Sequence, residues 1–196
     1  MDSTLAGQNR HPEFARRLPR TRAALEFADE RHAGQRREAD DAPFVMHPIE
    51  VASILYEAGY PDEVIAAGAL HDVIEDTDTE SRDIAARFGS RVALLVTAVT
   101  ENPAIENDAD RKAALRVQVA RAGENATAVF AADKISKVRE LRLQRSRGRF
   151  DPASRAKLAH YEASLEMLAE QMPGHELVEQ LRMELEALRA LPAGGL

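Results

Sequence analysis

Apolar residues recur at intervals of three and four along nearly the whole chain, whereas the strict alternation of a half-buried strand is almost absent. Pro48 and Pro61 each suit the first turn of such a segment, because a proline there loses no helical hydrogen bond. Ser90 is a natural N-cap. We therefore predict an all-α bundle in which helices distant in sequence meet. Further helices are expected over residues 81–88, 91–99, 109–122 and 125–145, with a polar loop over 101–108.

The last third of the chain carries two more amphipathic segments. Asp151-Pro152 is a suitable N-cap and N1 pair for the first of them, and leucines at helical spacing run from Leu177 to Leu188 in the second. These stripes most simply pack on the rest of the bundle, and a contact between copies in a homo-oligomer is the alternative. We expect a disordered tail over residues 1–20, a core over 21–150 and C-terminal helices over 151–191 packed on that core.

Composition narrows the class of protein. The chain has 196 residues, no cysteine and a formal net charge of -7. The absence of cysteine removes disulfides, thiolate nucleophiles and cysteine-based zinc sites, and the negative charge argues against non-specific binding to nucleic acid. The N-terminal segment has no apolar leader, and no run of about 18 apolar residues occurs anywhere. We expect a cytoplasmic protein with no membrane or nucleic-acid partner.

One short string concentrates metal-binding side chains. His71, Asp72, Glu75 and Asp76 lie within six residues, and in a continuous helix the pairs four residues apart would stack on one side. Carboxylates so close to one another repel unless a cation intervenes. Imidazole and carboxylate together suit Mn²⁺, Fe²⁺, Zn²⁺ or Mg²⁺. The alternative is an acidic, solvated helix end with an incidental histidine.

Two further candidates lie far from this string. His32 lies on an amphipathic segment, and Asp133 follows the apolar run over residues 126–132. A histidine in such a place is often part of the core, and an aspartate there is often a cap. If the bundle brings both to His71 and Asp72, they would complete a metal site.

Basic residues cluster directly after Asp133. Lys134, Lys137 and Arg139 fall within two helical turns of it, where a bound phosphoryl group would need cations. Arg36 and Arg37 could supply a second clamp. The more distant arginines, from residue 145 to 149, are interpreted as a solvated surface.

These pieces occur in one order that resembles a known family. The strings are His32-Ala33-Gly34-Gln35-Arg36-Arg37, Pro43-Phe44-Val45-Met46-His47-Pro48, His71-Asp72-Val73-Ile74-Glu75-Asp76-Thr77, Phe88-Gly89 and Ala132-Asp133-Lys134. Over about residues 21 to 145 the chain resembles the HD-domain hydrolases of the RelA/SpoT homologue family, in particular the small alarmone hydrolases. The resemblance implies an HD-domain helical bundle, here with additional C-terminal helices.

The resemblance also implies roles for the residues. In that family the metal ligands correspond to His32, His71, Asp72 and Asp133, and the metal is Mn²⁺, although the ligand set alone equally admits Fe²⁺. An acidic pair corresponding to Glu75 and Asp76 positions or activates the attacking water. The family removes the 3′-diphosphate from the guanine-nucleotide alarmone ppGpp or pppGpp. Phosphate contacts are expected from the five basic residues Arg36, Arg37, Lys134, Lys137 and Arg139.

Several positions depart from that pattern or lie outside it. Lys137 stands where many of these hydrolases have asparagine, so an amide that donates and accepts has become a pure cation. Phe44 replaces a common tyrosine. His47 is interpreted as a partner for a nearby carboxylate or backbone group, not as a metal ligand. The remaining histidines, His11, His160 and His175, are expected on the surface.

Three functions from different classes follow. The first is a manganese-dependent (p)ppGpp 3′-pyrophosphohydrolase, which gives GDP or GTP and pyrophosphate. The second is an HD-domain phosphohydrolase acting on another nucleotide or small phosphoester. The third is a non-catalytic nucleotide sensor, which is disfavoured because a binding module would not need both the expected ligands and the acidic pair.

Overall fold

The computed structural model describes residues 12–192 and confirms the all-α class. Within these residues there is no strand, and the β-type pairing consists of an isolated antiparallel bridge between Arg36 and Pro43. No described helix is long and apolar enough to cross a bilayer. The helices are η1 (Glu13–Arg17), α1 (Pro19–Arg31), α2 (Met46–Glu57), α3 (Asp62–Ala69), α4 (Val73–Asp76), α5 (Ser81–Phe88), α6 (Ser90–Val99), α7 (Asp108–Ala122), α8 (Glu124–Ser146), α9 (Pro152–Gln171) and α10 (Glu176–Ala190).

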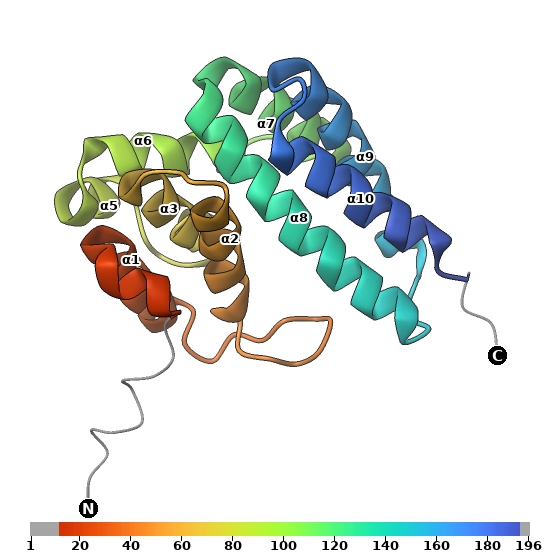
Figure 1. Cartoon of the computed structure of the whole chain (residues 1–196), viewed down its shortest axis with the longest axis horizontal. Coiled ribbons are helices and arrows are strands. Elements are labelled where there is room, and N and C mark those ends of the chain that lie inside the picture. Colours follow the sequence, from red (N-terminus) through yellow and green to blue (C-terminus); the bar gives the residue numbers. More distant parts are fainter. Residues whose placement is uncertain (1–11, 193–196) are drawn as a thin grey trace, which may run out of the picture.

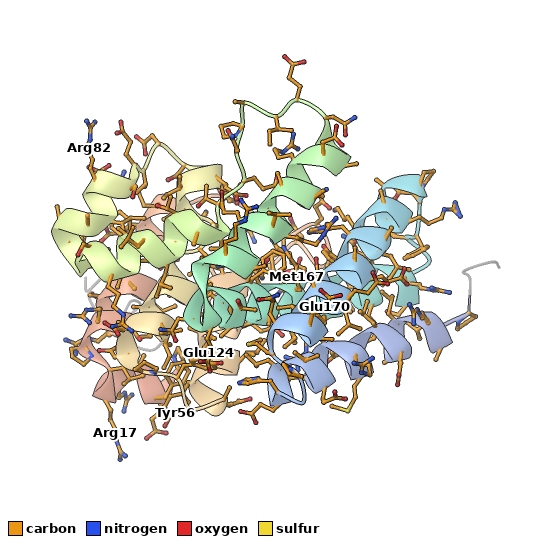
Figure 2. All side chains as sticks on the ribbon, turned by 90° about the horizontal axis from the view of Figure 1, so that it is seen from above. Arg17, Tyr56, Arg82, Glu124, Met167 and Glu170 are labelled. Atoms are coloured by element: carbon orange, nitrogen blue, oxygen red, sulfur yellow. The ribbon has the colours of Figure 1, made fainter. Side chains whose placement is uncertain are left out.

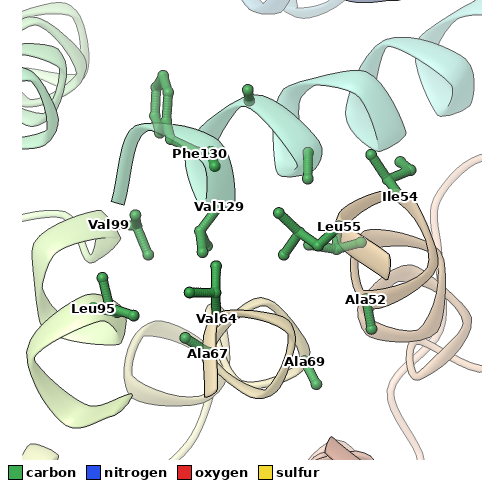
Figure 3. Packing of buried hydrophobic residues seen from close by; sticks show 14 of the residues in the cluster. Ala52, Ile54, Leu55, Val64, Ala67, Ala69, Leu95, Val99, Val129 and Phe130 are labelled. Atoms are coloured by element: carbon green, nitrogen blue, oxygen red, sulfur yellow. The ribbon is translucent and has the colours of Figure 1, made fainter. Parts of the chain in front are cut away.

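Helix α8 is the central element of the bundle (Figure 1). Its N-terminal half, which contains the apolar run over 126–132, is buried on all sides, because α2, α3 and α6 cover one face and α9 and α10 another. Figure 3 shows this packing, with Leu55 of α2, Val64 of α3 and Val99 of α6 directed toward Val129 of α8. The buried run therefore brings the residue that follows it, Asp133, into the interior.

The C-terminal helices pack against the same central helix. Asp151 caps α9, because its side chain accepts a hydrogen bond from the backbone N–H of Ser154 at 2.8 Å. Leu177, Leu181 and Leu185 of α10 are fully buried against α8 and α9. Viewed from above, α9 also lies beside α7 (Figure 2). One wall of the interior next to Asp133 is thus built by the C-terminal third of the chain.

The first described residues differ from the expected disordered tail. Residues 13–17 form η1, Ala15 is buried, and the Phe14 ring stacks on Tyr56 with 4.4 Å between ring centroids. The expectation of a disordered tail is therefore wrong for residues 12–20, which hold α1 against the bundle. Its remainder, residues 1–11, lies outside the described residues.

The helix that was expected to carry His71 and Asp72 is interrupted. Helix α3 ends at Ala69 and α4 begins at Val73, so both residues lie in a turn between helices. The Gly68 carbonyl would accept from the backbone of Asp72 in a continuous helix, but it accepts from the His71 imidazole at 2.8 Å. The imidazole thus replaces a backbone donor and helps to end the helix.

Gly68 also allows a close approach of two helices. A Cβ atom at this position would collide with Leu55 Cδ1 and would lie 3.3 Å from Val51 Cγ1, both on α2. The side chains of Leu55 and Val51 are both fully buried, so they have little room to move. The absence of a side chain at Gly68 therefore fixes how closely α3 packs on α2.

Candidate metal centre and cavity

His71 presents a bare nitrogen to the interior. Its ring is 4 % exposed, and its Nδ1–H donates to the Gly68 carbonyl, which can only accept. When the ring is neutral its single proton is therefore on Nδ1, and Nε2 carries a lone pair. A backbone carbonyl on the far nitrogen is the usual way of orienting a metal-binding histidine.

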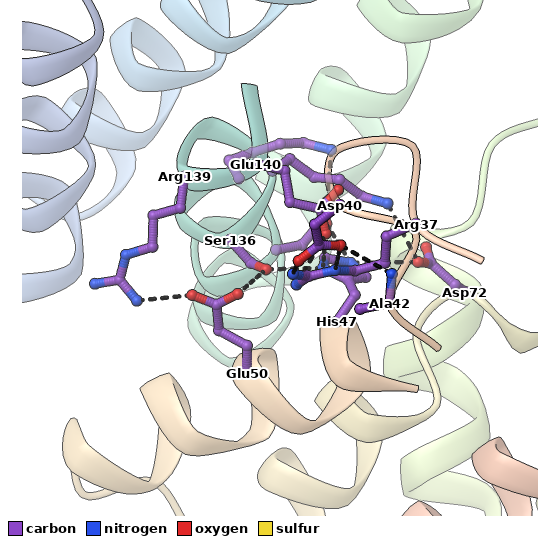
Figure 4. A network of polar contacts seen from close by, with 12 residues as sticks. Arg37, Asp40, Ala42, His47, Glu50, Asp72, Ser136, Arg139 and Glu140 are labelled. Carbon is purple, nitrogen blue, oxygen red and sulfur yellow. Dashed lines mark hydrogen bonds and ion pairs between the residues drawn. The ribbon is translucent and has the colours of Figure 1, made fainter. Parts of the chain in front are cut away.

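His47, in the first turn of α2, is held in the same way (Figure 4). Ser136 donates its hydroxyl hydrogen to Glu50 Oε2 at 2.8 Å, so the Ser136 oxygen accepts the Nδ1–H of His47, also at 2.8 Å. Nε2 of His47 is then bare, and it lies 3.1 Å from Nε2 of His71. Two lone pairs this close together repel unless a cation lies between or beside them.

Two buried carboxylates complete the arrangement. Asp72 approaches His71 Nε2 at 3.0 Å and His47 Nε2 at 3.3 Å, and Asp133 Oδ1 lies 3.2 Å from His47 Nε2 and 3.4 Å from His71 Nε2. Asp72 Oδ2 and Asp133 Oδ1 are buried with no hydrogen-bond partner in the part of the chain that the structure describes. Orphaned buried carboxylate oxygens beside bare imidazole nitrogens fit a divalent cation.

In the protein without metal, the pKa values of His71 and Asp72 also favour a positive charge between the carboxylates. Burial lowers the pKa of His71, but the carboxylates of Asp72 and Asp133 outweigh it and raise the pKa to about 10. Burial opposes ionisation of Asp72 as well, yet the charges of His71 and Lys137 hold its pKa well below the usual range. A proton on the imidazole thus takes the electrostatic place of a metal ion.

This geometry corrects the interpretation of His47. Among residues 12–192, the group whose ligand atoms lie mutually within 4.8 Å is His47, His71 and Asp133. His47 was expected to be a partner and not a ligand; it contacts both carboxylates, but its bare nitrogen places it in the metal group itself. The sequence signal was present in the His47-Pro48 string, but the role depends on the acceptor at Nδ1, which Ser136 supplies from α8.

His32 lies outside that group. It is 3 % exposed, its Nδ1–H donates to Gln35 Oε1 at 2.8 Å, and Gln35 is oriented by donating its amide to the Asp76 carbonyl. Its Nε2 is buried without a hydrogen-bond partner among the described residues. Burial lowers the pKa of His32, so the ring is neutral at pH 7. The structure therefore places His32 near the acidic pair and not among the mutually close ligand atoms.

The acidic pair lines the cavity beside the metal group. Burial raises the pKa of Glu75 to about 7, although its Oε1 accepts a short hydrogen bond from the backbone N–H of Glu101. Burial, and then the charge of Asp72, also raise the pKa of Asp76. A carboxyl group with a pKa of about 7, as at Glu75, can hold or release a proton near neutral pH.

The cavity has a volume of about 630 Å³, a size typical of small-molecule sites, and four of the five expected phosphate-binding residues line it. Arg139 does not. Its guanidinium donates to Glu50 at 2.9 Å (Figure 4) and to Glu184 at 2.7 Å, and so ties α8 to α2 and α10. We therefore leave Arg139 out of the substrate contacts. The four that line the cavity are Arg36, Arg37, Lys134 and Lys137.

These four cations differ in how tightly they are held. Lys134 Nζ lies 2.6 Å from Asp133 Oδ2 and over the Phe130 ring, and Lys137 Nζ lies 3.5 Å from Asp72 Oδ2. Burial lowers the pKa of Lys137, but the charges of Asp72 and Asp133 raise it by more. Lys137 is therefore charged, and both lysines face the metal group.

The two arginines lie on the loop between α1 and α2. Arg36 is exposed and donates to the Asp41 carbonyl at 2.9 Å. Arg37 forms a two-bond ion pair with Asp40 and lies 3.5 Å from Glu140. Arg36 is thus the more accessible of the two to a ligand.

His160 lines the cavity, although the sequence did not place it there. It was expected on the surface, but it is 7 % exposed and lines the cavity from α9. It precedes Ser164 by four residues and Leu168 by eight, and both are fully buried. That helical spacing is the signal that could have placed it inside. Of the other two histidines expected on the surface, His175 is half-buried and caps α10, and His11 lies outside the described residues.

Sequence comparisons agree with this architecture. Residues 24–149 match the model of a family described as HD domain. The human guanosine-3′,5′-bis(diphosphate) 3′-pyrophosphohydrolase MESH1 is 38 % identical over 121 residues, which cover 60 % of this chain and 67 % of that protein. A guanosine-3′,5′-bis(diphosphate) 3′-pyrophosphohydrolase of Aquifex aeolicus is 45 % identical over 91 residues. That match covers 46 % of this chain but 12 % of the Aquifex protein, so this chain corresponds to a small part of it.

Solved structures resemble the fold over most of its length. A metazoan orthologue of SpoT, described as hydrolysing ppGpp, superposes with a TM-score of 0.73 at 26 % identity, covering 88 % of this chain and 96 % of that one. A protein from Listeria monocytogenes superposes with a TM-score of 0.65 at 28 % identity, covering 74 % of this chain and 94 % of the other. The likeness to the first extends beyond the residues matched by the HD-domain model.

Proposed function

The chain belongs to the HD-domain family, and from this membership we propose that it is a metal-dependent phosphohydrolase that removes the 3′-diphosphate from (p)ppGpp. The products are GDP or GTP and pyrophosphate. The observation that carries the proposal is the pair of bare, buried imidazole nitrogens facing orphaned carboxylate oxygens in a nucleotide-sized cavity lined by cations. The names of the relatives support the choice of substrate.

In this proposal His47, His71, Asp72 and Asp133 hold one divalent ion, Mn²⁺ or Fe²⁺. When bound, such an ion polarises a phosphoryl oxygen and lowers the pKa of water from about 15.7 toward 7. Asp72 joins the set because its two oxygens lie 3.0 and 3.3 Å from the two bare nitrogens.

Glu75 and Asp76 orient the attacking water and take its proton. Water adds to the phosphorus bonded to the 3′ oxygen, that P–O bond breaks, and the 3′ oxygen leaves with a proton. A carboxyl group with a pKa of about 7, as at Glu75, can accept the first proton and return one to the leaving oxygen. The lysine and arginine side chains that line the cavity neutralise the phosphates.

A second candidate is hydrolysis of another nucleotide or small phosphoester. The observation that favours it is Lys137, whose ammonium lies 3.5 Å from Asp72 where many alarmone hydrolases carry an amide. A cation cannot accept a hydrogen bond from a sugar or base, so the contacts available to the nucleoside differ.

The two candidates are separated by a turnover panel. The Mn²⁺-loaded protein is assayed against ppGpp, GDP, deoxynucleoside triphosphates, cyclic dinucleotides and a generic phosphodiester, with nucleotide and pyrophosphate products quantified. We expect ppGpp to be converted to GDP and pyrophosphate with the highest kcat/KM of the panel. Efficient turnover of another member without turnover of ppGpp would establish the second candidate.

A further inference from the structure

One end of the cavity is lined by hydrogen-bond donors from three helices. His160 lies on α9, Lys112 and Arg116 on α7, and Lys134 on α8; all except Arg116 line the cavity. Helices α7 and α9 lie side by side there (Figure 2).

The contact between Arg116 and His160 fixes the state of the imidazole. Arg116 Nη1 lies 2.8 Å from His160 Nδ1. A guanidinium can only donate, so Nδ1 accepts, and the ring is neutral with its one proton on Nε2. Burial, together with the charges of Lys134, Arg116 and Lys112, lowers the pKa of His160 to about 3, which agrees with a ring that stays neutral. His160 therefore offers a donor, the Nε2–H group.

The acidic residues near this end are already bound. Asp108 accepts from Lys112 Nζ at 2.7 Å and from Arg111, and Glu101 accepts from Arg111 Nε at 2.6 Å. Arg116 is less well compensated, because burial lowers its pKa and the opposing charge comes from Glu166. Each lysine ammonium at this end has three N–H donors and uses one of them in its ion pair, so donors remain for an anion.

This donor cluster adjoins the metal centre. Lys134 Nζ lies 2.6 Å from Asp133 Oδ2, so the same ammonium faces both the metal group and His160. A phosphoryl group at the metal centre and a second one at the donor cluster would both contact Lys134. Consecutive phosphoryl groups of a diphosphate share a bridging oxygen and are close enough to do so.

We propose that His160, Lys112 and Lys134 form a subsite for the terminal phosphoryl group of a diphosphate whose inner phosphoryl group lies at the metal centre. Arg116 acts through His160, as a positioning residue that fixes its tautomer. The inference rests on the proposed function and adds that the protein selects a diphosphate over a monophosphate at the position where it cleaves. Helix α9, outside the residues that match the HD-domain model, supplies part of that selectivity.

The test uses inorganic pyrophosphate and inorganic phosphate as probes. Their dissociation constants are measured by calorimetry on the full-length Mn²⁺-loaded protein. Lys112 is partly exposed, so Lys112→Gln should fold normally. We expect it to weaken pyrophosphate binding about tenfold or more, the loss typical of one hydrogen bond between charged groups, and to change phosphate binding less than twofold. The matched control is Lys157→Gln, one helical turn before His160 on α9, where Lys157 lines the cavity but pairs with Glu38; it should leave the ratio of the two affinities unchanged.

A pair of substitutions tests the tautomer. In His160→Asn the amide oxygen can still accept from Arg116, but the donor at the Nε2 position is lost; in His160→Gln an amide N–H reaches that position. We expect the asparagine variant to lose pyrophosphate affinity about tenfold and the glutamine variant to retain most of it. Thermal melting checks that both are folded.

Kinetics separate this inference from the proposed function. We expect Lys112→Gln to lower kcat/KM for ppGpp about tenfold more than for the 3′-monophosphate analogue. Equal losses for both substrates, or wild-type pyrophosphate affinity in both Lys112→Gln and His160→Asn, would overturn the subsite. If ppGpp is not a substrate but the preference for pyrophosphate over phosphate is lost in these variants, the subsite stands and the proposed substrate falls.

Discussion

Two buried histidines line the same cavity and have opposite chemistry. The Nδ1 of His71 donates to the Gly68 carbonyl, which leaves Nε2 bare. The Nδ1 of His160 accepts from Arg116, which leaves a proton on Nε2. The far side of each ring therefore decides whether the near side is a metal ligand or a hydrogen-bond donor. Burial alone does not distinguish them.

The charged groups around the two rings also have opposite signs. His71 faces Asp72 and Asp133, and its pKa in the protein without metal is raised to about 10 even though burial opposes this. His160 has Lys134, Arg116 and Lys112 around it, and with burial these lower its pKa to about 3. One end of the cavity requires a cation and the other excludes one. A metal complex of a diphosphate satisfies both ends.

The largest expected effect on hydrolysis comes from removing a proposed metal ligand. Asp72→Ala removes a buried carboxylate that faces both bare imidazoles, so we expect hydrolysis to fall below detection and stoichiometric Mn²⁺ binding to be lost. Helical circular dichroism should be largely unchanged, because Asp72 lies in a turn and not in a helix. A variant that keeps one tightly bound Mn²⁺ by elemental analysis would show that Asp72 is not a ligand.

The next effect separates chemistry from metal binding. Glu75→Gln keeps the size of the side chain and its acceptor for the Glu101 backbone, but it cannot take a proton. We expect kcat to fall on the order of 10²-fold, the usual share of general acid-base catalysis, with Mn²⁺ affinity within a few-fold of the wild type. Asp76→Asn is the parallel variant. Wild-type turnover in both would eliminate the acidic pair from the mechanism.

A comparison of His47 with His32 tests the correction made by the structure. We expect His47→Ala to weaken Mn²⁺ binding by on the order of 100-fold or more, since it removes a ligand, and His32→Ala to weaken it by less than tenfold. Ser136→Ala should fall between them, because losing an outer partner of a ligand typically costs 10- to 100-fold. Isothermal titration of metal-free protein with Mn²⁺ gives all three values. The reverse order would return His32 to the ligand set.

The smallest expected effect concerns acid stability. In the folded protein His160 stays neutral down to about pH 3, whereas in the unfolded chain it takes up a proton near pH 6.5. Stability is therefore lost as the pH falls below 6.5, by at most about 1.4 kcal/mol per pH unit. The facing cations Lys112, Arg116 and Lys134 add to this, and the charge of Asp133 opposes it.

Urea unfolding at pH 7.5 and 5.5 measures this contribution. His160→Gln has no titrating ring, so its stability should fall by about 1.4 kcal/mol less than that of the wild type between these two pH values. Parallel losses in the two proteins would mean that His160 is protonated in the folded state, and the contrast with His71 would disappear.

The periodicity of the sequence predicted most helices because local spacing and capping determine them. Residues 81–88 form α5 as expected, and Asp151 caps α9 through its side chain. Ser90 is an informative exception: it is the first residue of α6, and Gly89, with φ of 95°, takes the cap position. A positive φ of this kind is readily adopted by glycine, so the backbone requirement decided the boundary.

The metal site was less predictable because it depends on contacts between distant residues. The sequence places His71 beside Asp72, but it does not show that Ser136, 89 residues after His47, orients the second imidazole. It also does not show that a side chain bonded to Gly68 interrupts the helix. His160 was misplaced because it lies outside the matching strings and its helical spacing from Leu168 was not weighed.

The packing of Gly68 makes the metal centre sensitive to a single methyl group outside the cavity. Helix α2 carries His47 and the end of α3 precedes His71, so the gap between these helices sets the separation of the two imidazole nitrogens. Gly68→Ala would place a methyl group against the buried side chains of Leu55 and Val51, which would have to shift. A shift passed on to α2 would change the position of His47 relative to His71.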